Sequence, residues 1–225
     1  MLSQAIGAIL PAAAAVALSP IPIVAVVLVL DSARARVNGP AFAAGWVAGL
    51  AVVSVVVVNL AGGASNATSG VATSVNWGMA AIGVLFLVMA ARQWRKRPKA
   101  GEEAEMPAWM ATVDSVAPGK AFVLGAALSG ANPKNLALTL AASASIAQAG
   151  LDAAGETVAV VTFIVIGSLT VVGAVAVYLA APRWAKGPLG SIRQFMSANN
   201  ATIMMVILLI LGAKILGDAV SGLWS

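Results

Sequence analysis

The chain has 225 residues, of which 60% are hydrophobic and 9% are charged, and its mean hydropathy is +0.96. Because about a quarter of the residues in a soluble domain are charged, this composition predicts an integral membrane protein. The chain has no Cys and no His, which excludes thiolate and imidazole metal sites and His-based proton relays. Carboxylates, lysines, hydroxyls, amides and the backbone remain for chemistry, and we expect no enzymatic activity, no metal site and no cofactor.

Apolar segments close to the length of about 20 residues that spans a bilayer recur six times, separated by turn signals or charges. Their approximate ranges are 3–30, 40–62, 75–91, 118–148, 157–181 and 200–220. The sequence therefore predicts an all-α membrane protein of six transmembrane helices. We expect a first three-helix repeat over 1–91, a connecting loop over 92–117, and a second three-helix repeat over 118–225.

The positive charges predict the orientation of these spans. Eleven of the thirteen Lys and Arg residues follow the first, third or fifth apolar segment. Since Lys and Arg accumulate in cytoplasmic loops, we expect both termini to lie outside a bacterial inner membrane. The same clusters explain the net charge of +5 without a basic, aromatic-lined groove for nucleic acid.

The loop over 92–117 begins with a basic cluster, Arg92–Arg97, and then becomes acidic at Glu102, Glu103 and Glu105. Apolar residues at helical spacing follow, and these are Met106, Trp109, Met110 and Val113. The pattern predicts a short amphipathic helix on the inner leaflet, with a solvated linker as the alternative. The basic cluster can contact anionic lipid headgroups, and the loop is a candidate contact for lipid-export machinery.

The first and fourth apolar segments are both interrupted by proline. Ser19-Pro20-Ile21-Pro22 follows Ala-Leu in the first, and Ser129-Gly-Ala-Asn132-Pro133-Lys134 follows Ala-Leu in the fourth. Proline removes a backbone donor and frees carbonyls, and a broken helix survives in lipid only where it faces protein or water. Two three-span units of this kind predict inverted repeats, whose binding sites lie at the broken helices.

The residues at the two breaks are therefore the candidate substrate-binding site. They are Ser19, Pro20, Pro22, Ser129, Asn132, Pro133, Lys134 and Asn135. Lys134 lies inside the fourth apolar segment, and ionisable residues at such depth are usually functional. The alternative is a lysine that extends its side chain to the membrane surface.

Three other polar residues lie within or beside the apolar segments. Lys214 and Asp218 are four residues apart, which predicts an ion pair on one helix face. Asp31 ends the first segment, where a local contact with Arg34 is the favoured interpretation. Asp31, Lys214 and Asp218 are also candidates for ion or proton coupling.

Small residues in the second span form a face that permits close helix contact. Its centre is Gly45 and Gly49, with Ala41, Ala44 and Ala48 nearby. The sequence leaves open whether this contact lies within one chain or between two copies in a homodimer.

The sequence resembles the lysine-exporter superfamily, and within it the peptidoglycolipid-addressing (GAP) branch, which includes the sulfolipid-1-addressing proteins. The resemblance rests on Ala17-Leu-Ser-Pro-Ile-Pro-Ile-Val24 and Leu128-Ser-Gly-Ala-Asn-Pro-Lys-Asn-Leu136, together with six spans and a basic central loop. It implies export, either of amino acids or of surface glycolipids.

Three functions remain open from the sequence. The first is a secondary transporter or flippase-like exporter of a polar-headed or anionic lipid, with Lys134 at the headgroup. The second is an exporter of amino acids, and the third is a membrane scaffold that recruits a lipid-export machine. Because an unpaired buried charge is costly, a zwitterionic amino acid needs a carboxylate beside Lys134. No such residue is evident, and the first function is therefore favoured.

Overall fold

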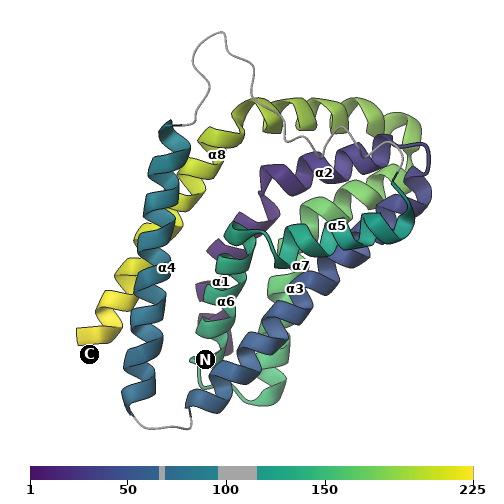
Figure 1. Ribbon diagram of the computed structural model, residues 1–225. Helices are drawn as coiled ribbons and strands as arrows, with labels where there is room; N and C mark the ends of the chain where they lie inside the picture. The colour runs from purple at the N-terminus through teal and green to yellow at the C-terminus, as the bar shows by residue number, and fades with distance from the viewer. Residues whose placement is uncertain (66–68, 96–115, 225) are drawn as a thin grey trace.

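A computed structural model describes residues 1–65, 69–95 and 116–224 of the chain. All the secondary structure in these ranges is helical (Figure 1). The helices are α1 (Leu2–Ala17), α2 (Pro20–Asp31), α3 (Ala35–Ser65), α4 (Ser69–Arg95), α5 (Pro118–Gly130), α6 (Pro133–Ala147), α7 (Ala153–Ala180) and α8 (Pro182–Trp224). The predicted amphipathic helix near Trp109 lies outside the described residues.

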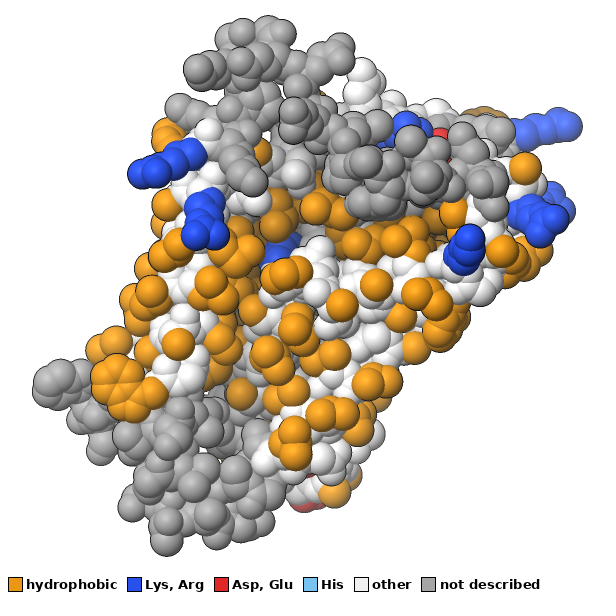
Figure 2. Space-filling view, viewed as in Figure 1, with side chains coloured by type: hydrophobic (Ala, Val, Ile, Leu, Met, Phe, Trp, Pro, Cys, Tyr) orange, Lys and Arg blue, Asp and Glu red, His pale blue; other side chains and the backbone are white. Residues whose placement is uncertain are grey.

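Four of the described helices are long and apolar enough to cross a membrane, namely α3, α4, α7 and α8. The pair α1–α2 makes a fifth if its two bent parts count as one span. Figure 2 shows hydrophobic side chains over the middle of the visible face, with Lys and Arg mainly toward its upper part. The chain is therefore a membrane protein, whereas six spans in two inverted repeats stay a prediction.

The helices break at the predicted prolines. The α1 helix ends at Ala17 and α2 begins at Pro20, with a bend of 49° between them. Likewise, α5 ends at Gly130 and α6 begins at Pro133. Proline favours the first turn of a helix because its missing N–H would have no intrahelical partner there. Each proline therefore starts a new helix.

The last helix is longer than the sequence predicts. An apolar span was expected over 200–220, but α8 begins at Pro182 and runs for 43 residues. Its first part crosses the top of Figure 1 before the chain turns down toward the C-terminus, and α8 packs against α2. Contact with another helix stabilises this less apolar segment, which hydropathy by itself does not reveal.

Two pairs of helices approach each other closely at glycine residues. A Cβ atom on Gly45 would collide with the carbonyl oxygen of Phe122, and one on Gly125 with that of Phe42, so α3 and α5 touch through their backbones. A Cβ atom on Gly83 would lie 2.8 Å from the amide nitrogen of Leu216, so α4 and α8 also approach closely at a glycine. The predicted small-residue face of α3 is thus an internal contact.

The helices form two groups. We call α1, α2, α3, α5, α6 and α7 the break unit, since it contains both interrupted helices, and the other group is the α4–α8 pair. The groups meet chiefly where α2 and α7 contact α8, while α4 and α6 touch little. In Figure 1 both termini lie in the lower half and α2 lies near the top. We call these the termini end and the α2 end.

Candidate functional site

The two helix breaks lie against each other inside the break unit. Lys134, in the first turn of α6, is only 2% exposed. Its Nζ atom donates to the carbonyl oxygen of Ala15 at 2.8 Å and to Ser19 Oγ at 2.6 Å. The lysine of one break therefore binds the backbone and hydroxyl of the other, and it does not extend to the surface.

These contacts use carbonyls that the first break has freed. The amide of Ser19 turns back to the Val16 carbonyl at 3.2 Å, so it cannot serve Ala15 four residues earlier. Lys134 fills that role instead. The carbonyl of Ala17 accepts from Thr170 Oγ1 of α7 at 2.6 Å. Since a buried carbonyl without a donor is costly, these side chains make the break stable.

The second break is satisfied by its own asparagines. Asn132 precedes α6 and its side chain accepts from the amide of Lys134 at 3.1 Å, which caps the helix. Asn135 Nδ2 donates to the Leu128 carbonyl at 2.9 Å, while its Oδ1 accepts from Ser19 Oγ at 2.8 Å. A continuous set of hydrogen bonds therefore runs from Lys134 through Ser19 and Asn135 to α5.

The structure thus brings together four of the predicted site residues, Ser19, Asn132, Lys134 and Asn135. Pro20 and Pro133 start the flanking helices and Pro22 lies in the first turn of α2. Ser129 Oγ donates to the Ala126 carbonyl at 3.1 Å within α5. Thr170 was missed because one threonine in an apolar helix carries no distinguishing pattern. It became visible only through its contact with α1.

The Lys134 ammonium has only neutral oxygens as partners among the described residues. The salt bridges in this part of the chain are Arg193–Asp31 and Lys214–Asp218, and neither includes Lys134. Within the same ranges no three acidic side chains gather as a metal site would require. The charge on Lys134 would therefore be balanced most directly by an anionic ligand.

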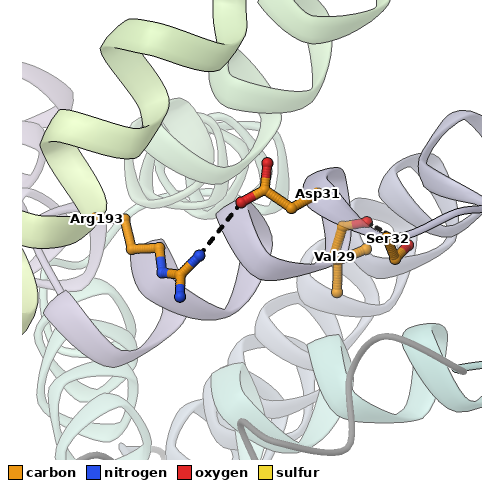
Figure 3. Close-up of polar contacts among 4 residues, drawn as sticks. All are labelled: Val29, Asp31, Ser32 and Arg193. Carbon is orange, nitrogen blue, oxygen red and sulfur yellow. Dashed lines mark hydrogen bonds and ion pairs between the residues drawn. The ribbon is translucent and has the colours of Figure 1, made fainter.

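Asp31 forms a different contact from the one the sequence predicts. Its Oδ2 lies 3.3 Å from Arg193 Nη1 of α8, and the two side chains point toward each other (Figure 3). The predicted pairing of Asp31 with Arg34 is wrong. The α8 helix crosses the end of α2 and brings Arg193 to Asp31 instead. Ser32 Oγ meanwhile donates to the Val29 carbonyl at 2.6 Å as the chain leaves α2. Asp31 therefore links the break unit to the α4–α8 pair.

A small pocket of about 30 Å³ lies between the break unit and the α4–α8 pair. Its lining comes from α1, α4, α6 and α8, and consists of Ala8, Pro11, Ala12, Met79, Ala141, Ala142, Ser145, Leu211, Lys214, Ile215 and Asp218. None of the predicted break residues lines it. Most of the lining is ordinary apolar helix surface, which no sequence motif distinguishes from the rest of a span.

The pocket nevertheless lies further along the same pair of helices, α1 and α6, that meet at Lys134. Ala12 and Ala8 lie about one and two helical turns before Ala15 in α1. Ala141 lies about two turns after Lys134 in α6, or roughly 10 Å along the axis. The helix faces that meet at Lys134 therefore lead toward the pocket at the termini end.

The predicted ion pair of α8 forms and borders this pocket. Lys214 Nζ lies 2.6 Å from Asp218 Oδ2, one turn away. Both side chains are partly exposed, at 41% and 61%. The pocket therefore has apolar walls and a single pair of opposite charges.

The fold and site define a membrane protein built around two proline-broken helices, in which Lys134 of the second break satisfies a carbonyl freed by the first. The chain belongs to the SfLAP family, described as Sap, sulfolipid-1-addressing protein, whose family model matches residues 9–221. No curated protein matches the chain, and no solved structure matches it. Membership of the wider lysine-exporter superfamily stays a prediction.

Proposed function

We propose that this protein carries a polar-headed or anionic lipid across the bacterial inner membrane toward the cell surface. The family description, which refers to addressing of a sulfolipid, supports a role in lipid export. The observation that carries the proposal is the pocket between the break unit and the α4–α8 pair. Its apolar walls and single ion pair suit a ligand with a long apolar part and a small polar part.

The charges near the site favour such a ligand over an amino acid. A zwitterion needs one cation and one anion that are both free to bind it. In the pocket, Lys214 and Asp218 already neutralise each other. At the breaks, Lys134 has no carboxylate partner among the described residues. A ligand with one negative group and an apolar remainder matches both places.

The proposed path joins the pocket to the two breaks. A lipid headgroup would follow the contact between α1 and α6 and meet Lys134, where it would replace the Ala15 carbonyl and Ser19 hydroxyl as partner. The apolar part of the lipid would remain in the bilayer beside the pocket. Discontinuous helices that expose carbonyls and helix N-termini at such a point are a recurring way to bind transported groups.

We further propose that the termini end faces outward. The positive-inside distribution of Lys and Arg supports this orientation. Figure 2 agrees in that the blue side chains lie mainly in the part of the view away from the termini end. In this orientation the pocket lies at the outer side of the membrane, where an exported lipid would leave the protein.

One experiment tests both the pocket and the orientation. The chain has no Cys, so Ala8→Cys in the pocket and Gly7→Cys beside it can be compared directly. A Cβ atom on Gly7 meets nothing within 4 Å. An impermeant thiol reagent added outside intact cells should label both variants and stop lipid export only in Ala8→Cys. Gly187→Cys at the other end should not be labelled.

The measurement is the amount of surface glycolipid by mass spectrometry, alongside amino-acid efflux, in a deletion strain that carries each variant. We expect the deletion to deplete the surface lipid and to leave efflux unchanged. Normal surface lipid with impaired efflux would instead indicate the amino-acid exporter. If the deletion depletes the surface lipid but labelled Ala8→Cys still exports it fully, the lipid does not pass through the pocket. That result would indicate the scaffold. Labelling of Gly187→Cys from outside would contradict the orientation.

A further inference from the structure

The ion pair of α8 holds no two helices together. Lys214 and Asp218 belong to adjacent turns of one helix, and their 2.6 Å contact leaves both side chains partly exposed. Exposed pairs of this spacing contribute little to stability. The other salt bridge in the described ranges, Arg193–Asp31, joins α8 to α2. A structural role explains that bridge well but explains the Lys214–Asp218 pair poorly.

The surroundings of the pair carry no charge on any other helix that lines the pocket. α1 contributes Ala8, Pro11 and Ala12, and α4 contributes Met79. From α6 come two alanines and Ser145, whose Oγ already donates to the Ala141 carbonyl at 2.9 Å. Lys214 is thus the one cation among the pocket-lining residues, and Asp218 the one anion.

The geometry makes Asp218 a replaceable partner. Its side chain is 61% exposed, lies on the side of Lys214 nearer the C-terminus, and has Lys214 as its salt-bridge partner. A cavity of about 30 Å³ exceeds the roughly 10–15 Å³ that one water requires and admits a small group of oxygens but not a whole lipid. A headgroup could therefore enter while its chains stay outside against α4 and α8.

We propose that Lys214 is the anion-binding group of a lipid headgroup subsite, and that Asp218 is its displaceable counter-ion. The ligand class is a lipid with a phosphate or sulfate ester, bound through charge-assisted hydrogen bonds from the ammonium. When no lipid is bound, Asp218 neutralises the ammonium, so the empty pocket does not hold an unpaired charge. This inference rests on the proposed function and specifies the part of the pocket that recognises the headgroup.

The test uses the full-length protein in phosphatidylcholine vesicles with spin-labelled phosphatidylglycerol or spin-labelled phosphatidylcholine as probe. Electron paramagnetic resonance gives the relative affinity of the protein for the two lipids. Removing the cation in Lys214→Gln should lower the preference for phosphatidylglycerol about fivefold, because an exposed charge pair is worth up to about 1 kcal/mol, which corresponds to that ratio. Removing the competitor in Asp218→Asn should raise it. The double variant should match Lys214→Gln.

Opposite effects of the two substitutions distinguish this role from a structural pair. If both substitutions lower the preference, or neither changes it, the proposal is wrong. Inorganic phosphate should not displace the labelled lipid, and displacement would show a site for free anions instead. Arg193→Gln, at the other end of α8, serves as the control and should leave the preference unchanged. Export that proceeds with unaltered lipid preference in Lys214→Gln would overturn this inference alone, whereas absence of export by the wild type would overturn the proposed function.

Discussion

The break unit and the α4–α8 pair are joined very differently at their two ends. At the α2 end, α2 packs along α8 and the Arg193–Asp31 salt bridge crosses between the groups. At the termini end, α4 and α6 have few contacts and a pocket lies between the groups. The salt bridge there, Lys214–Asp218, is confined to one helix. The two groups are therefore firmly joined at the α2 end, which we call the closed end, and more loosely joined at the termini end.

The two groups also differ in how their polar atoms are arranged. In the break unit, carbonyls freed by the breaks are bound by Lys134, Asn135 and Thr170 across helix boundaries. The α4–α8 pair has no break in its described residues and is held by close backbone contact at Gly83 and Gly212. Each group is thus internally well connected, and less contact joins the two groups to each other. This comparison leads to three predictions.

The largest effect is expected from Lys134→Ala. This change removes the donor to Ala15 and Ser19 and leaves buried acceptors unsatisfied, at a cost of about 1–3 kcal/mol per group. We expect lipid export to be abolished and the thermal midpoint of the purified protein to fall, while the protein still inserts. Lys134→Arg should restore export only partly, because a guanidinium is a larger planar fork.

The control for this prediction is Lys120→Ala. Lys120 lies in the first turn of α5 and is exposed, so its removal should alter neither export nor stability. Normal export together with unchanged stability in Lys134→Ala would show that the ammonium serves neither the lipid nor the breaks. A fall in stability with normal export would confine Lys134 to a structural role.

An intermediate effect is expected from locking the closed end. Asp31→Cys together with Arg193→Cys places two thiols where the salt bridge joins α2 to α8. If export requires the groups to move apart at this end, a short bis-thiosulfonate cross-linker should stop lipid export, and reduction should restore it. Each single-cysteine variant treated in the same way is the control. Full export by the cross-linked protein would show that the α2 end stays closed during transport.

The smallest effect is expected from Thr170→Val, which keeps the side-chain shape but removes the hydroxyl that binds the Ala17 carbonyl. The loss should be about 1 kcal/mol in unfolding free energy, typical of one hydrogen bond. Thr162→Val is a matched control on the same helix, since Thr162 Oγ1 binds the Val158 carbonyl of α7 itself. Equal effects of the two changes in chemical denaturation would contradict a special role for Thr170.

The sequence by itself determined the local features of this protein. Hydropathy predicts a membrane protein because burial of apolar residues in lipid depends on composition and segment length. Pro20 and Pro133 predict the helix breaks because a missing N–H acts on its own turn. The Lys214–Asp218 pair follows from spacing within one helix. These predictions need no knowledge of neighbouring helices.

Only the tertiary structure decided which distant groups meet. Nothing in the sequence couples Lys134 to Ala15 or Asp31 to Arg193, since 119 and 162 residues separate the partners. The first half of α8 is helical where a loop was expected, and it packs against α2. The pocket lining is drawn from four helices whose apolar residues look alike in sequence. Such contacts depend on how whole helices pack, and that packing is set by the sum of many weak interactions.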